Sequence, residues 1–182
     1  RAVSSAQNAV PHLLRGFLQQ YPSVNVNLNI VNRTQAIERL NDNKEDLVIM
    51  GLVPNDRSLS SLPFLDNELI PVVPVHHPLA TKKHIHPQQF LDAQLLSRES
   101  GSGNRLALEQ HCQQQRLSLN VTMQFGSNDA LKHAVLAGLG VAVLPRLSVL
   151  SELLLGQLVS PVIKGFPLRR SWCLVSPQGK HA

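Results

Sequence analysis

The chain has 182 residues, enough for one compact domain or two small lobes. Hydrophobic residues make up 43% and aromatic residues only 4%, so the core must be aliphatic, which suits buried strands covered by helices. The formal net charge is +5, but the basic residues are scattered and their densest groups are pairs. This distribution argues against a nucleic-acid surface and suits a small anionic ligand at least as well.

The first part of the chain predicts alternating strands and helices. Apolar residues follow helical spacing after residue 9, and strict alternation over Val24–Ile30 predicts a strand with one polar face. The predicted elements are a strand ending at 3–5, helix 9–21, strand 24–30, helix 34–41 and strand 46–50. Because strand–helix–strand crossovers are right-handed, this order predicts a parallel α/β sheet.

Two strand candidates follow at 62–65 and 68–75, and the second contains Pro71 and Pro74. Proline cannot donate to a ladder, so this segment should be an edge strand or a crossover between lobes. A second cycle then predicts strands at 94–98, 121–125, 141–144 and 169–176, with helices at 104–115, 128–137 and 148–155. Two such cycles predict two lobes with a cleft, and ligands in such folds bind at the carboxyl ends of strands.

Three polar turns between a strand and a helix are candidate ligand sites. In the first, Ser4, Ser5 and Gln7 would lie beside the free N–H groups of a helix start, which hold carboxylate or phosphate oxygens. The alternative is that Ser or Asn in this turn simply caps the helix. In the third turn, 125–129, Ser127 is expected to cap the helix and Asn128 to face the cleft, although a simple cap is the slightly favoured interpretation.

The second turn spans 98–105 and is rich in glycine and serine. Glycines allow a backbone to curl around a ligand, and the next helix offers its positive end. The residues expected to bind are Ser100, Ser102, Gly103, Asn104 and Arg105, with Arg98 or Arg105 supplying charge. The alternative for Arg105 is that it faces solvent from the helix. The spacing matches neither a Walker loop nor a nucleophile elbow, and the alternative is a flexible turn with a helix cap.

Other chemistry is not expected. His76, His77, His84 and His86 lie close in sequence, but they lack the second ligand cluster of a zinc site, so solvated loop histidines are the favoured interpretation. His111, Cys112 and His133 lie in predicted helices and are interpreted as structural. Cys112 and Cys173 are expected to be free thiols in a reducing cytosol. No catalytic set, cofactor site, membrane span or signal peptide is expected.

Five segments, in order along nearly the whole chain, resemble motifs of LysR-type effector domains. Segment 11–22 resembles P-x-L-L-x-x-F-x-x-x-Y-P, and 46–51 is similar to their D-L-A-I strand. Segment 77–80 matches H-P-L-A, 98–105 resembles R-E-x-G-S-G-T-R, and 138–145 resembles G-L-G-I-A-L-L-P. The chain departs from the fourth of these patterns, at 98–105, by having Asn104 where threonine is usual.

The resemblance implies a fold like a type 2 periplasmic binding protein, with two Rossmann-like α/β subdomains, two crossover strands and an effector in the cleft. The subdomains would be residues 1–74 with 146–182, and 75–145. The family's winged helix-turn-helix is absent from this chain, which opens at Arg1-Ala2-Val3 as if in mid-strand. DNA binding would therefore belong to an upstream segment, and the domain would be a cytoplasmic, non-enzymatic sensor that forms dimers or tetramers.

Segment 49–54 resembles the I-M-G-x-x-P of CbbR-type regulators of carbon fixation, a group that includes CmpR and NdhR (CcmR). This implies control of CO2-fixation or inorganic-carbon-uptake genes. It also implies an anionic effector such as ribulose 1,5-bisphosphate, 2-phosphoglycolate or 2-oxoglutarate. The alternatives are a periplasmic solute-binding protein, which would carry a signal peptide, and an α/β enzyme, which would show perturbed titratable pairs in a cleft.

Overall fold

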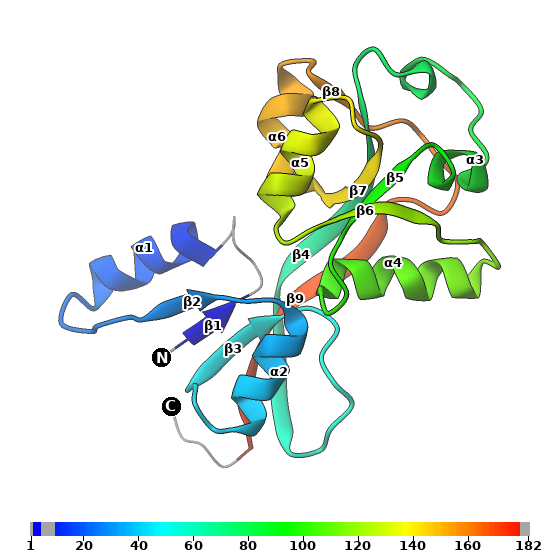
Figure 1. Ribbon diagram of the computed structural model, residues 1–182. Coiled ribbons are helices and arrows are strands. Elements are labelled where there is room, and N and C mark those ends of the chain that lie inside the picture. The colour runs from blue at the N-terminus through cyan, green and yellow to red at the C-terminus, as the bar shows by residue number, and fades with distance from the viewer. Residues whose placement is uncertain (1, 5–9, 179–182) are drawn as a thin grey trace. The chain divides into compact units, whose positions relative to one another are not determined.

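The computed structural model describes residues 2–4 and 10–178 (Figure 1). Contacts divide the chain into two compact units. Unit 1 holds residues 1–66 and 170–182, and unit 2 holds residues 67–169. Relative to the boundaries expected from the sequence, residues 67–74 and 146–169 group with unit 2, because the helix and strands they form pair and pack with its sheet.

Unit 1 is built on three short parallel strands. Strand β1 lies between β2 and β3, and β9 adds to β3 in the antiparallel sense, with Ile49 opposite Leu174. The parallel α/β sheet predicted from the sequence is confirmed here. The elements are β1 (Ala2–Ser4), α1 (Val10–Gln20), β2 (Leu28–Ile30), α2 (Arg33–Asn41), β3 (Leu47–Met50) and β9 (Leu168–Pro177).

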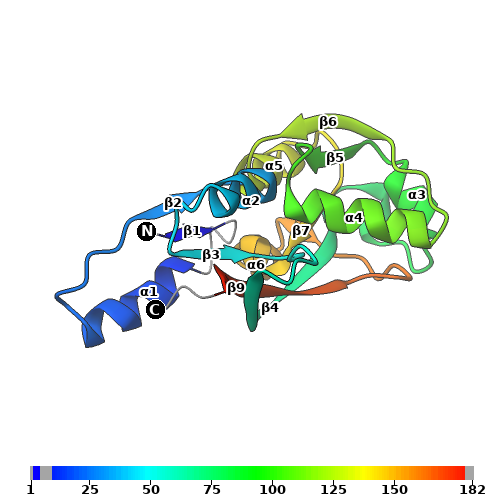
Figure 2. The same cartoon turned by 90° about the horizontal axis from the view of Figure 1, so that it is seen from below.

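The two helices of unit 1 cover opposite faces of its sheet, as Figure 2 shows. Side chains alternate across a strand. Accordingly Val48 and Met50 pack with α2, while Ile49 between them packs with Val10 of α1 and with Trp172. Each face of the sheet therefore has its own hydrophobic cluster.

Strand β4 (Leu59–Pro74) is one continuous strand of 16 residues, and not the two separate strands expected from the sequence. Its first eight residues belong to unit 1 and its last eight to unit 2, so it carries the chain from one unit to the other, and β9 carries it back. Pro71 lies within this strand opposite Val143 of β7. The expectation of a crossover strand is confirmed.

Unit 2 combines parallel and antiparallel pairs. Strands β5 and β6 are parallel, an isolated bridge joins Leu95 to Val141 at the start of β7, and β4 pairs antiparallel with β7 and β8. The elements are 3-10 helix η1 (Pro78–Ala80), α3 (Pro87–Leu91), β5 (Leu95–Arg98), α4 (Gly103–Gln114), β6 (Val121–Phe125), α5 (Asn128–Leu136), β7 (Ala142–Pro145), α6 (Arg146–Leu154) and β8 (Leu158–Val159). The short elements η1, α3 and β8 were not predicted.

Helices α5 and α6 lie side by side over this sheet (Figure 1). Their inward residues, including Leu131, Val135 and Val149, pack on Leu96 and Leu144 of the strands. Gly140 packs tightly against the backbone of Gln94. A Cβ added to it would lie 2.1 Å from the carbonyl oxygen of Gln94, so no other residue fits without moving the backbone before β5.

Candidate functional site

Two loops of unit 2 bring polar side chains to the carboxyl ends of neighbouring parallel strands. Arg98 ends β5 and lies opposite Phe125, which ends β6. The Glu99 N–H donates to the Phe125 carbonyl at 3.0 Å and ties the two loops together. Helices α4 and α5 begin within a few residues, so their positive N-terminal ends lie on the same loops. The 98–105 and 125–129 turns singled out in the sequence therefore meet.

A hydrogen-bonded cluster joins these loops through the side chain of Asn128. Its Oδ1 accepts a 3.0 Å hydrogen bond from Nη1 of Arg98 and a 3.5 Å hydrogen bond from Nδ2 of Asn104. Asn128 is 9% exposed, whereas Asn104 is half-buried. Since the amide oxygen of Asn128 already accepts two hydrogen bonds, the cluster has amide N–H groups to offer to a further acceptor, and such donors can bind oxyanions.

The arginines of this site are already paired within the chain. Nε of Arg98 donates to Oε1 of Glu99 at 2.9 Å, and the two side chains are 13% and 29% exposed. Arg105 donates from Nε to Glu109 at 2.9 Å and from Nη1 to the Arg98 carbonyl at 3.1 Å. Arg105 therefore stabilises the turn, and the charge of Arg98 is balanced within the chain by Glu99.

Ser102 and Ser127 cap the two helices. Oγ of Ser102 accepts the Arg105 N–H at 3.4 Å, and Oγ of Ser127 accepts the Ala130 N–H at 3.0 Å. Ser102 is 3% exposed, so its hydroxyl serves the helix, while Ser100 is exposed on the turn. The N–H groups of Gly103 and Asn104 have no acceptor within the helix, which leaves them available to a ligand.

The serine-rich turn of unit 1 lies mostly outside the described residues. Ser4 ends β1, but its side chain is not described, and Ser5 and Gln7 fall in the undescribed segment. The carboxyl ends of the neighbouring strands are described. Because β1, β2 and β3 are parallel, these ends share one edge of the sheet.

Arg33 lies at this edge and was not among the residues predicted from the sequence to bind a ligand. It is the first residue of α2, next to a capping box formed by Asn32 and Gln35, and no acidic residue lies in the first turn. Nε of Arg33 donates to the Leu52 carbonyl at 2.9 Å, and burial lowers the pKa of its guanidinium. A cation at a helix N-terminus is disfavoured by the helix dipole. The helix was predicted to begin at Thr34, so Arg33 was treated as a loop residue and its place at a helix N-terminus was missed.

Two histidines cap helices, and both cysteines are buried. Among the described residues, no group of three His, Cys, Asp or Glu side chains could hold a metal ion. Nδ1 of His77 caps η1 and Nδ1 of His86 caps α3, each accepting a backbone N–H at 3.1 Å. Burial raises the pKa of the thiols of Cys112 and Cys173. In the described part of the chain, no helix is long and apolar enough to cross a membrane.

Comparison with known proteins places these features in a family. A family model described as the LysR substrate binding domain matches residues 2–182. The transcriptional activator CmpR of Synechocystis is 37% identical over 179 residues, covering 98% of this chain and 59% of that protein. A RuBisCO operon transcriptional regulator of Acidithiobacillus ferrooxidans is 39% identical, with 98% and 58% covered. The chain thus spans about three fifths of the length of these relatives.

Solved structures agree with the sequence comparison. The regulatory domain of Synechocystis CcmR, solved in complex with 2-PG, shares 35% identity at a TM-score of 0.90, covering 99% of this chain and 87% of that one. The effector-binding domain of QuiR, solved with shikimate, has a TM-score of 0.84 at 20% identity, which shows a shared fold. The fold implied by the resemblance in the sequence is confirmed.

Proposed function

This chain belongs to the family of LysR substrate-binding domains, and from that premise we propose that it is the sensor of a regulator of carbon-fixation or inorganic-carbon-uptake genes. The names of the relatives support this role, since they include CmpR, CbbR and RuBisCO operon regulators. The chain covers about three fifths of each, so we assign DNA contact to the remainder of a longer regulator. The domain itself binds an effector without converting it.

The effector we propose is a small anionic metabolite of the phosphorylated or dicarboxylic type. The observation that carries this proposal is the cluster of Arg98, Asn104 and Asn128 where two parallel strands end and two helices begin. The amide N–H donors of this cluster are neutral and the charge of Arg98 is paired with Glu99, so an oxyanion can be held without burying an unpaired charge. The CcmR structure with 2-PG supports the same class of ligand.

Arg33 is proposed as a second contributor to anion recognition. Its Nε is held by Leu52, so the two terminal nitrogens of its guanidinium remain to form the fork that binds carboxylate or phosphate oxygens. Within the described chain no carboxylate pairs with it. The helix dipole and partial burial both disfavour its charge in the absence of a ligand, and a bound anion would relieve both effects.

The test is calorimetric titration of the domain with ribulose 1,5-bisphosphate, 2-phosphoglycolate and 2-oxoglutarate in turn. We expect at least one to bind below about 1 mM, and Asn104→Ala and Arg33→Ala each to weaken it about tenfold, a change of about 1.4 kcal/mol. Asn120→Ala is the matched control, because Asn120 is exposed before β6 and outside the cluster. Binding by none of the three, or normal binding by both variants, would contradict the assignment.

We further propose that the domain self-associates in the cytoplasm as a dimer or tetramer. Leu147, Leu150 and Leu154 of α6 are 45%, 41% and 87% exposed, and their spacing of three and four residues places them on one face of the helix. A row of exposed leucines is typical of a protein interface. The occupant we propose is a second copy of this chain.

A further inference from the structure

Unit 2 has a pocket whose lining shares no residue with the 98–105 and 125–129 turns of the proposed effector site. It has a volume of about 580 Å³, within the usual range for small-molecule sites, and it is open to solvent. Residues from two separate segments line it: Lys83, His84, Ile85, His86 and Gln89 from the region before and within α3, and Val162 and Lys164 after β8.

Backbone and side-chain contacts hold the two segments together. Ile85 and Ile163 form a parallel backbone bridge, and both side chains are buried. Three residues after Ile163, the ring of Phe166 packs against Phe90 and against His111 at centroid distances of 6.1 and 5.2 Å. Because this bridge and the ring contacts hold both lining segments in place, the pocket is a fixed feature of this unit rather than a gap between loose loops.

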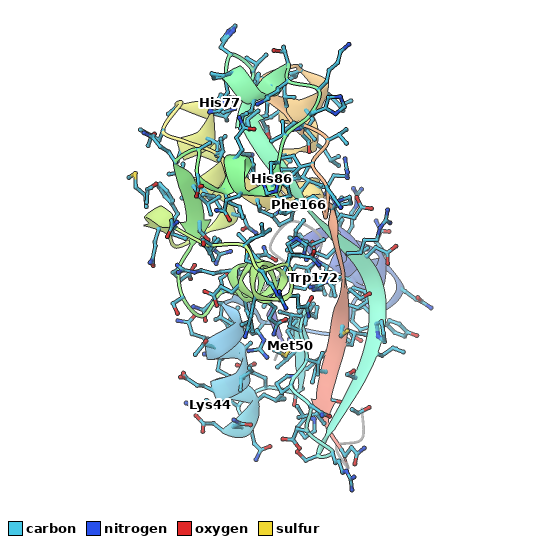
Figure 3. All side chains as sticks on the ribbon, turned by 90° about the vertical axis from the view of Figure 1, so that its right-hand side faces the viewer. Lys44, Met50, His77, His86, Phe166 and Trp172 are labelled. Atoms are coloured by element: carbon cyan, nitrogen blue, oxygen red, sulfur yellow. The ribbon has the colours of Figure 1, made fainter. Side chains whose placement is uncertain are left out.

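The polar groups around the pocket are mainly donors. Lys83 and Lys164 contribute ammonium groups. His86, labelled in Figure 3 where α3 begins, uses Nδ1 to accept the Gln88 N–H, so the proton of its neutral ring resides on Nε2. Oε1 of Gln89 accepts from Lys82 at 3.0 Å, which leaves the NH2 of the amide as its free function. The lining therefore offers N–H groups from four side chains.

Acidic side chains are absent from the lining of this pocket in the described structure. The acidic residue on the adjoining turn, Asp92, is engaged with Nε2 of Gln88 at 2.9 Å. The two lysines consequently have no carboxylate in the lining to balance them. A concave surface with positive charge and N–H donors concentrates anions, and the attraction weakens with salt because charges are screened beyond about 8 Å at physiological ionic strength.

We propose that this pocket is a second anion-binding site, for a small molecule that carries a phosphate or pyrophosphate group and binds independently of the effector. Lys83 and Lys164 approach the anion from two sides, and Nε2–H of His86 donates a directed hydrogen bond. The role does not depend on the gene-regulatory assignment, since it rests only on residues of this pocket.

The test uses inorganic pyrophosphate as the probe and follows backbone amide signals of the domain by NMR. We expect saturable shifts at Ile85, Gln89 and 162–164, stronger at low salt. Lys83→Gln with Lys164→Gln should reduce affinity at least tenfold. His86→Asn should reduce it several-fold while preserving the helix cap, since asparagine caps well. Lys44→Gln, which removes an exposed lysine of unit 1, is the control and should bind normally.

Three outcomes would overturn the proposal. The first is a response confined to the amides of 99–105 and 127–130, which would mean that pyrophosphate enters the effector site alone. The second is equal loss of affinity in Lys44→Gln and in the double variant, which would mean diffuse attraction to surface charge. The third is saturation of the pocket amides by a short DNA duplex but not by pyrophosphate up to roughly 10 mM, which would assign the pocket to a polymer backbone.

Discussion

Arg98 and Asn128 are thirty residues apart in the chain, yet a 3.0 Å hydrogen bond joins Nη1 of the arginine to Oδ1 of the amide. This bond links the end of β5 to the start of α5. It also orients the amide of Asn128, because Oδ1 accepts from Arg98 and Asn104, and we propose that Nδ2 donates to the effector. Changing that nitrogen to oxygen is therefore the most informative substitution available.

We expect Asn128→Asp to separate stability from binding. The new carboxylate would keep the bond to Arg98 and would add a negative charge at the start of α5, where the helix dipole favours it by about 0.3–1 kcal/mol. The melting temperature should therefore be equal to or above that of the wild type. Effector affinity should fall at least tenfold, because a donor is lost and the anion meets a like charge.

The two quantities are measured on the same samples by thermal unfolding and calorimetric titration. Asp129→Asn changes a charge at the next position of the same helix turn, on an exposed side chain, and serves as the control. Wild-type affinity in Asn128→Asp would remove Asn128 from the binding site.

A second prediction concerns the cap of α4. Ser102→Ala removes the acceptor for the Arg105 N–H and should lower the free energy of unfolding by about 1 kcal/mol. Ser100→Ala, in the same turn but exposed, should leave it within about 0.5 kcal/mol of the wild type. Urea denaturation of the three proteins gives the comparison. Equal stability of the Ser102 variant would show that the cap contributes little.

These two serines also show which features of the 98–105 turn could be predicted from the sequence. The glycine- and serine-rich turn was correctly placed between a strand and a helix, because turn chemistry is local. Which serine caps the helix depends on how the turn curls, and Gly101 takes a positive φ of 99° that only the folded backbone reveals. Of the hydroxyls proposed to bind a ligand, Ser102 proves to be the N-cap.

Longer-range features were harder to predict. Alternation over Val24–Ile30 predicted a full strand, but only Leu28–Ile30 pairs in the sheet, and the exposed Val24 and Val26 precede it. Hydrophobic alternation reports a tendency and not a hydrogen-bonded partner. In contrast, β3 was placed within one residue, because a short apolar run between polar segments has few other possible environments.

A third prediction follows from His77, whose pKa burial lowers in the folded protein. In the unfolded chain histidine titrates near pH 6.5, so between the lowered folded pKa and that value the unfolded state binds more protons. The contribution of His77 to the free energy of unfolding is therefore fully present above about pH 6.5 and declines as the pH falls below that value. Protonation would also remove Nδ1 as the acceptor for the Leu79 N–H.

His77→Asn keeps a side chain that can cap η1 and removes the titrating group. The melting temperature should thus decrease less between about pH 7.5 and about pH 5.5 in this variant than in the wild type. Thermal scans at the two pH values measure the difference. An identical decrease in both proteins would show that another group causes the acid sensitivity.

The fourth prediction tests the leucine row of α6. Leu150→Glu with Leu154→Glu should shift the domain to monomers, because charges would be buried at the interface. Both side chains are exposed in the single chain, so the fold should tolerate the change. Light scattering after size-exclusion chromatography measures the mass. Leu62→Glu, at a 61% exposed position of unit 1, is the control, and an unchanged mass of the double variant would place the contact elsewhere.

The tight contact at Gly140 has a genetic consequence. Any side chain at this position would push on the carbonyl of Gln94, the residue immediately before β5, and β5 ends at Arg98. If the chain is part of a regulator of the kind proposed above, a selection for alleles that no longer respond to the effector should recover changes at Gly140, outside the proposed site. Such an allele would be mistaken for a contact mutant unless the neighbouring strand were considered.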